Sequence, residues 1–156
     1  MSKKFDVAAV GNAIVDVLAN IDDQFLDDQN LNKGSMTLID EARSEAIYEK
    51  MPPAITASGG SAANTIAGIA SLGGKTAYIG KVKNDRFGEI FAHDLRSLGV
   101  HYNTPFAESG PQTATCLISI TPDAERTMAP YLGATTKLAP ADIDLNIIAN
   151  ANITYL

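Results

Sequence analysis

The sequence is poor in the residues that build disulfides and metal sites. Its 156 residues include one cysteine, two histidines and no tryptophan. A single cysteine, Cys116, excludes a disulfide within the chain and fits a reducing compartment. Two histidines and one cysteine that lie far apart in the sequence cannot supply the clustered ligands of a zinc site. We therefore expect no disulfide framework and no resident metal.

A surplus of positive charge is also lacking. Lys and Arg number 12 against 18 Asp and Glu, which gives a formal net charge of -6. Proteins that bind nucleic acid neutralise phosphates with clustered cations, so this balance argues against a nucleic-acid partner. An acidic protein can still bind an anion such as ATP through backbone N–H groups and one or two local cations.

No long apolar run is present. Lys3 and Lys4 precede a short apolar stretch, but Asp6, Asn12 and Asp16 interrupt it. The sequence therefore predicts neither a signal peptide nor a membrane-spanning segment. With 46% apolar and 19% charged residues, the composition is that of a soluble, folded protein, which we expect to be cytoplasmic.

Strand and helix patterns alternate along the first hundred residues. The strand patterns are Phe5–Val10, Ile55–Ser58 and Lys75–Gly80. The helix patterns are Asp22–Asp28, Glu41–Met51 with Asp40 as its cap, Ser61–Leu72 with Ser61 as its cap, and Asp85–Leu98. Short apolar strands between amphipathic helices predict an α/β fold with a mostly parallel sheet flanked by helices.

A second group of strand patterns predicts a small sheet standing off the main one. Gln112–Thr121 alternates and is rich in β-branched residues, Pro122 and Asp123 form a turn, and Arg126–Ala129 returns. We expect this hairpin, near residues 112–129, to join the strand patterns near 13–21 and 35–39.

The last residues resemble the interior of a domain more than its end. Pro140–Ile148 has a short helix pattern, and Asn152–Leu156 predicts one more buried strand. Chain termini usually lie at the surface, so we expect the 156 residues to be a truncated piece of a longer chain. A natural end in a central strand is the alternative.

Two polar residues follow the first predicted strand, Asn12 and Asp16. The carboxyl end of a parallel sheet is where such folds bind ligands. An ionised Asp accepts several hydrogen bonds and can hold two neighbouring hydroxyls of a sugar. The alternative is structural: Asn12 caps a turn, and Asp16 is a solvated strand residue.

A glycine pair, Gly59 and Gly60, precedes the predicted helix that carries Asn64. Such a pair lets the backbone approach a ligand at the helix N-terminus, although a plain tight turn would look the same. The run is neither a Walker A motif nor a G-x-G-x-x-G fingerprint. No nucleophile elbow surrounds Ser61, so it is not expected to be catalytic.

The spacing of these motifs is more specific than any one of them. The chain resembles the ribokinase (PfkB) family of carbohydrate kinases over essentially its whole length, with the region 22–40 most similar to the adenosine-kinase branch. The motifs that carry the resemblance are Gly11-Asn12 with Asp16, Gly59–Ala67, Leu72-Gly73, Gly80, Asp85–Gly88, Gln112–Cys116, Asp123–Thr127 and Leu132–Ala134.

The resemblance implies a ribokinase-like core with a β-sheet lid, here the N-terminal part of a kinase domain over residues 1–156. Enzymes of this family use ATP and Mg²⁺ to phosphorylate a primary hydroxyl of a sugar or nucleoside. Carried over by motif position, Asp16, Gly60 and Asn64 would hold sugar hydroxyls, with Asn12 and Gly59 beside them. Residues 13–21, Met36 and the hairpin that carries Cys116 would cover the base or the distal part of the substrate. Arg126 would help to position the substrate or a phosphate.

One family motif is missing. The family's catalytic base is an Asp in a G-A-G-D motif at a helix N-terminus, and no such motif occurs before Leu156. Asp85 lies in the N-terminal signature and is not expected to replace it. We therefore expect no catalytic residue in these 156 residues, and ATP- and Mg²⁺-binding segments beyond Leu156, so that the chain alone would be inactive.

Three readings of the function stay open. The first is the substrate-binding half of a kinase for adenosine or another purine nucleoside. The second is a kinase for a free sugar such as ribose or fructose, and the third is a non-catalytic module that binds a ribose-containing ligand. The resemblance also allows a homodimer through the lid.

Overall fold

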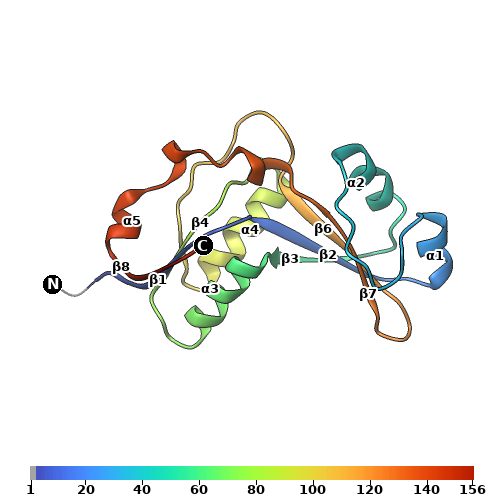
Figure 1. Ribbon diagram of the computed structural model, residues 1–156, viewed down its shortest axis with the longest axis horizontal. Helices are drawn as coiled ribbons and strands as arrows, with labels where there is room; N and C mark the ends of the chain where they lie inside the picture. The colour runs from blue at the N-terminus through green and yellow to red at the C-terminus, as the bar shows by residue number, and fades with distance from the viewer. Residues whose placement is uncertain (1–2) are drawn as a thin grey trace.

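The computed structural model describes residues 3–156 and arranges them around two four-stranded sheets (Figure 1). In the first sheet all strands are parallel, in the order β5-β4-β1-β8. Their bounds are β1 Phe5–Val10, β4 Thr76–Ile79, β5 His101–Tyr102 and β8 Ala151–Tyr155.

Helices cover both faces of this first sheet. Helices α3 (Ser61–Ser71) and α4 (Arg86–Ser97) lie on one face, where Ile66, Tyr78 and Phe91 share a buried cluster. The short helix α5 (Leu145–Ala149) covers the other face, and Ile147 packs there against Ala77. We call this sheet with its helices the core.

The second sheet is mixed and has the order β3-β2-β6-β7. Its strands are β2 (Ile14–Asn20), β3 (Ile55–Gly59), β6 (Ala114–Ile120) and β7 (Arg126–Tyr131). Strand β2 pairs antiparallel with β3 and parallel with β6, and β6 and β7 form the expected hairpin. Helices α1 (Asp23–Asp28) and α2 (Glu41–Tyr48) lie on one face of this sheet (Figure 1). We call the second sheet and these two helices the lid.

The fold class predicted from the sequence is confirmed: an α/β core with a mainly parallel sheet, and a second small sheet beside it. Asp40 caps α2 as expected, because its carboxylate accepts a hydrogen bond of 2.8 Å from the Arg43 N–H. Aspartates cap three further helices, α1, α4 and α5. Their short carboxylates satisfy backbone N–H groups that a helix leaves free at its start.

Other predictions about the elements were wrong. Residues 35–39 form no strand: they run beside β7 with a single bridge, between Met36 and Met128. Ser61 does not cap α3, because Gly60 occupies the cap position and Ser61 is the first helical residue. The expected helix over Pro140–Ile148 is split into a 3-10 turn, Pro140–Asp142, and α5. Strand β5 was not expected at all.

The last strand is not buried as predicted. Strand β8 lies at an edge of the first sheet and pairs only with β1. Ile153 is 60% exposed and Tyr155 is 39% exposed. Among the described residues the outer edge of β8 is therefore unpaired and has apolar side chains beside it.

No helix within residues 3–156 is long and apolar enough to cross a membrane.

A shielded ion pair fixes the 3-10 turn Pro140–Asp142 to the core. Lys81 Nζ lies 2.6 Å from Asp142 Oδ1, and the two side chains are 11% and 13% exposed. Burial opposes ionisation of Asp142, but hydrogen bonds from Lys81 and from the Ala139 N–H outweigh it and lower the pKa of this carboxyl. The pair therefore stabilises the fold only while Asp142 is ionised.

We predict that Asp142→Asn lowers the free energy of unfolding by ~1.5–3 kcal/mol near neutral pH, because Lys81 loses a charge-assisted hydrogen bond. Because the pKa of Asp142 is lower in the folded than in the unfolded protein, its ionised carboxylate contributes fully to stability above the unfolded-state pKa of about 4. This stabilisation is lost as the pH falls below that value. Urea denaturation at pH 7 and pH 3 should show a difference between variant and wild type that shrinks in acid. Asp27→Asn, an exposed residue of α1, is the control, and an equal difference at both pH values would contradict the prediction.

Candidate functional site

The two faces of the lid sheet differ in what covers them. On one face Val17, Leu117 and Ala129 pack with Leu26 of α1 and Ile47 of α2. On the other face the strand register aligns Asp16 with Ala57 and Cys116, and Cys116 with Pro130. Neither lid helix lies on this second face (Figure 1). We call it the open face; by register it also contains Ile14, Leu18, Ile118 and Met128.

Asp16 is the one acidic residue that the strands place on the open face. Within residues 3–156 its half-buried carboxylate accepts no hydrogen bond. Burial raises the pKa of this carboxyl above its usual value. A shielded carboxylate without protein donors is costly unless a ligand supplies them. Asp16 is therefore placed to accept hydrogen bonds from a bound molecule.

Gly59 makes the space that Asp16 occupies. A Cβ at Gly59 would lie 2.4 Å from Cγ of Asp16, far inside van der Waals contact. Any side chain here would displace the carboxylate. The glycine at this position is thus required by the position of Asp16.

Gly60 brings the start of α3 against the turn between β1 and β2. Its φ of +92° is in the region that favours glycine, and a Cβ would lie 2.7 Å from the carbonyl oxygen of Asn12. The same carbonyl oxygen accepts a hydrogen bond of 3.0 Å from the Tyr78 hydroxyl. Asn64 follows in the first turn of α3, where its N–H donates to the Gly60 carbonyl at 2.8 Å.

The structure therefore brings together five of the residues that the sequence singled out: Asn12, Asp16, Gly59, Gly60 and Asn64. They come from the β1–β2 turn, β2, the end of β3 and the first turn of α3. The helix end adds backbone N–H groups that no side chain caps. A half-buried acceptor beside uncapped donors is suited to a small polar molecule with neighbouring hydroxyls.

The other three predicted residues extend the open face away from Asp16. Cys116 is its direct neighbour on β6 and is 8% exposed. Met36 is 69% exposed at the sheet edge, opposite Met128. Arg126 pairs with Ile120, four residues along β6 from Cys116, which is ~13 Å at 3.3 Å per residue. Arg126 thus shares the face with Asp16 but is not adjacent to it.

Several open-face residues were not singled out individually, although the segment 13–21 and the hairpin near 112–129 were expected to cover the substrate. Ile14, Ala57, Ile118, Met128 and Pro130 lie on the same face as Asp16 by register. They give one half of the face an apolar surface beside the polar Asp16 end. The signal that could have found them is the period of two along β6 and β7, counted from Cys116.

Cys116 is chemically quiet in this setting. Burial, and secondly the charge of Asp16, raises the pKa of its thiol to about 12. The thiolate, which is the reactive form, is then almost absent near neutral pH. Cys116 is therefore a packing residue of the open face and not a nucleophile.

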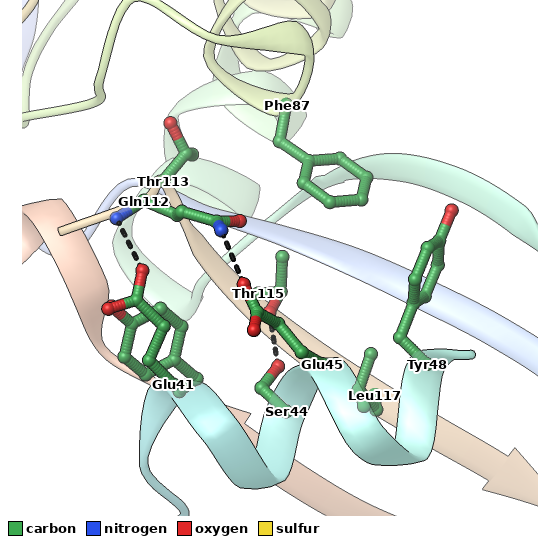
Figure 2. Close-up of a pocket in the computed structure, with 10 residues that line it drawn as sticks. Glu41, Ser44, Glu45, Tyr48, Phe87, Gln112, Thr113, Thr115 and Leu117 are labelled. Atoms are coloured by element: carbon green, nitrogen blue, oxygen red, sulfur yellow. Dashed lines mark hydrogen bonds between the residues drawn. The ribbon is translucent and has the colours of Figure 1, made fainter. Parts of the chain in front are cut away.

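A partly open cavity of about 40 Å³ lies on the other side of the lid sheet (Figure 2). Its wall includes Thr115 and Leu117, the neighbours of Cys116 that point towards the helices, together with side chains of α2 and α4. It is separated from Asp16 by the sheet itself and is not part of the candidate site.

The described part of the chain offers no metal centre: within residues 3–156 no three His, Cys, Asp or Glu side chains lie together as metal ligands.

An α/β core with a small β-sheet lid, and the Asp16 carboxylate where the two meet, define a fold of the ribokinase type, which is the fold of small-molecule kinases. The family model described as pfkB family carbohydrate kinase matches residues 45–156, and the chain belongs to this family.

Solved structures of similar proteins cover almost the whole chain. A probable sugar kinase from Rhizobium etli CFN 42 is 50% identical with a TM-score of 0.90, over 98% of this chain and 46% of that one. The adenosine kinase from Sinorhizobium meliloti is also 50% identical with a TM-score of 0.90, over 97% of this chain and 46% of that one.

Among curated relatives, fructokinase-2 from Solanum lycopersicum is 33% identical over 106 residues, which are 67% of this chain and 32% of the fructokinase. The chain thus spans about a third of the length of this relative and about half the length of the solved structures.

We predict that Cys116 resists alkylation by iodoacetamide. With a pKa of about 12, roughly one thiol in ten thousand is ionised near pH 8. Because the charge of Asp16 contributes to the raised pKa, Asp16→Asn should increase the alkylation rate, while Asp27→Asn should not. The rate can be followed by intact mass, since Cys116 is the sole cysteine. Rapid alkylation of the wild type, or no response to Asp16→Asn, would contradict the assigned positions.

Proposed function

We propose that this chain is the substrate-binding part of an ATP-dependent kinase that phosphorylates a primary hydroxyl of a purine nucleoside, with adenosine as the first candidate. The observation that carries the proposal is the Asp16 carboxylate, half-buried and without a donor among the described residues, on the open face of the lid. Two neighbouring ribose hydroxyls would supply the missing donors.

The remaining residues of the junction fit the same ligand. The Gly60 N–H and the Asn64 amide would bind hydroxyls beside Asp16, with Asn12 and Gly59 shaping the space between them. Since the sugar sits where lid and core meet, its primary hydroxyl would point away from the lid sheet. Binding there also shields the sugar from water, which strengthens each hydrogen bond.

The apolar half of the open face suits the nucleobase. Met36 and Cys116, with Ile118, Met128 and Pro130 around them, would pack against a purine. Arg126 would help to position the substrate or a phosphate from the far end of the lid. A free hexose has no group that would use this apolar surface.

The similarities to known proteins point to two substrate classes. The adenosine kinase from Sinorhizobium meliloti covers nearly the whole chain at 50% identity. Fructokinase-2 from Solanum lycopersicum matches a shorter part at 33% identity. The apolar open face favours the nucleoside, and a free sugar such as ribose or fructose is the second candidate.

ATP and Mg²⁺ belong to the proposal but not to these residues. The bound nucleotide would supply the phosphoryl group, and the described residues would bind and orient the acceptor. We expect the 156 residues alone to be inactive and the full-length protein to be the enzyme. A non-catalytic ribose-binding module is the alternative if the full-length protein binds adenosine without turnover. A homodimer through the lid and a cytoplasmic location stay predictions.

In the full-length protein, Asp16→Ala should raise the KM for the nucleoside at least roughly tenfold, since each lost charge-assisted hydrogen bond is worth ~1.5–3 kcal/mol. The pKa of Asp16 is raised, so the wild-type KM should rise as acidification protonates this carboxyl. Steady-state kinetics over a pH series measures both effects. Asp27→Ala, an exposed aspartate, is the control. An unchanged KM in Asp16→Ala would refute the role of Asp16.

The substrate class is decided by a comparison of acceptors. We expect kcat/KM of the full-length protein to be highest for adenosine, with ribose and fructose at least about tenfold lower, because they lack a base to bury on the apolar face. A coupled assay of ADP release measures all three. Preference for fructose would select the second candidate, and activity on none would sink the kinase proposal.

A further inference from the structure

The chain passes between core and lid at four places. These are residues 11–13 before β2, Gly59–Gly60 after β3, Gln112–Thr113 before β6, and Leu132–Gly133 after β7. Three of these crossings contain glycine, and Gly110 lies two residues before the crossing at Gln112–Thr113. The orientation of the lid over the core depends on how these crossings are held.

The crossing at Gln112–Thr113 is held by core helix α4. Thr113 is fully buried. Its N–H donates to Asp85 Oδ2 at 2.9 Å, and its hydroxyl donates to Asp85 Oδ1 at 2.7 Å. The Lys83 N–H donates to the same hydroxyl at 2.9 Å. We call the contacts between Asp85 and Thr113 the clasp.

Asp85 differs from the other helix-capping aspartates in this respect. Asp22, Asp40 and Asp144 each accept one bond, from an N–H of their own helix. Asp85 accepts such a bond from Gly88 at 2.8 Å, and two further bonds from Thr113. Capping alone therefore does not account for Asp85.

Lid residues hold the same crossing from the opposite side (Figure 2). The Gln112 N–H donates to Glu41 Oε1 at 3.2 Å, and its side-chain amide donates to Glu45 Oε1 at 2.7 Å. The Gln112 carbonyl accepts a bond of 2.7 Å from the Ala134 N–H, at the crossing after β7. Two adjacent residues thus join the lid helix α2, the core helix α4 and the lid exit.

Phe87 of α4 extends this contact into the lid. Its ring meets that of Tyr48 on α2 edge to face, with centroids 6.0 Å apart, and both rings line the cavity of about 40 Å³ (Figure 2). The cavity leaves room beside the rings, whereas the clasp has none: a Cβ on Gly88 would lie 3.1 Å from the Thr113 hydroxyl. The clasp is therefore a closely packed contact between lid and core, and the aromatic pair beside it has free space next to it.

We propose that Asp85 is a positioning residue: through Thr113 it fixes the root of β6, and with it the orientation of the open face that carries Asp16. Asp85 lies on the helix side of the lid sheet and does not touch the substrate. The effect on substrate binding rests on the proposed kinase function, while the effect on lid orientation does not.

Kinetics of the full-length protein test the proposal. Asp85→Asn keeps an oxygen for the cap but turns an NH₂ towards the Thr113 N–H, and Thr113→Val removes the hydroxyl at nearly constant volume. Each should raise the KM for the nucleoside about fivefold to thirtyfold with little change in kcat, because fewer molecules hold the binding orientation. Thr113→Ser, which retains the hydroxyl, should restore the wild-type KM. Asp40→Asn, at a cap without a second partner, should leave it unchanged.

A distance measurement tests the orientation without any assay of activity. Spin labels on Asp27→Cys in the lid and Ser71→Cys in the core, both exposed sites, should give a narrow distance distribution in the full-length protein. Asp85→Asn and Thr113→Val should broaden it, whereas Thr113→Ser should not. Cys116 is shielded from the label by its burial and high pKa.

The outcomes separate the two proposals. If the wild type phosphorylates no acceptor, the kinase function is refuted. The distance distributions then still show whether the clasp fixes the orientation of the lid. Unchanged distributions in Asp85→Asn and Thr113→Val overturn the clasp. The clasp is also refuted if the enzyme is active and the variants have a lower thermal stability but an unchanged KM. Asp85 would then have a structural role alone.

Discussion

The pairing of β2 with two partners is the interaction on which the lid and its site depend. Strand β2 is antiparallel to β3 and parallel to β6, so it joins a segment near residue 57 to one near residue 116. The first pairing sets Asp16 beside Gly59, and the second sets it beside Cys116. A shift of one residue in either register would turn Asp16 to the face that α1 and α2 cover. The buried side chains Val17 and Leu117 on that face oppose such a shift.

The residues that stabilise the lid and the residue proposed to bind a ligand, Asp16, lie on opposite faces of the same sheet. The apolar cluster that stabilises the lid lies on the helix side of its sheet, and Asp16 lies on the other side. A carboxylate whose pKa is raised by burial makes the folded state less stable as the pH rises, since ionisation is disfavoured there. Functional groups commonly carry such a cost. The apolar cluster between the lid sheet and its helices can offset the cost of Asp16, because side chains on the two faces of a sheet pack independently of each other.

The sequence was sufficient to predict the fold class, and it selected the polar residues and glycines that the structure brings together where lid and core meet. Glycines and the residues that follow a strand carry strong local signals, so Asn12, Asp16, Gly59, Gly60 and Asn64 could be chosen from spacing and the family resemblance. Strand β5 has only two residues, His101 and Tyr102, which is too few for a pattern. Residues 35–39 look like a strand, but Pro130 on β7 has no N–H to complete the bridge after Met36–Met128. The exposure of β8 depends on its edge position, and no local pattern encodes that.

The distance of Arg126 from Asp16 was equally beyond the sequence, because it follows from the register of two hairpin strands. The signature Asp85–Gly88 is the opposite case: the motif is easy to find, but its neighbour Thr113 is 28 residues away in the chain. Only the folded chain shows that the carboxylate has a partner outside its own helix. Under the proposals above, the clasp would fix the orientation of the lid over the core. Without such a contact, ligand binding would have to order the lid, and affinity would fall by that entropic cost.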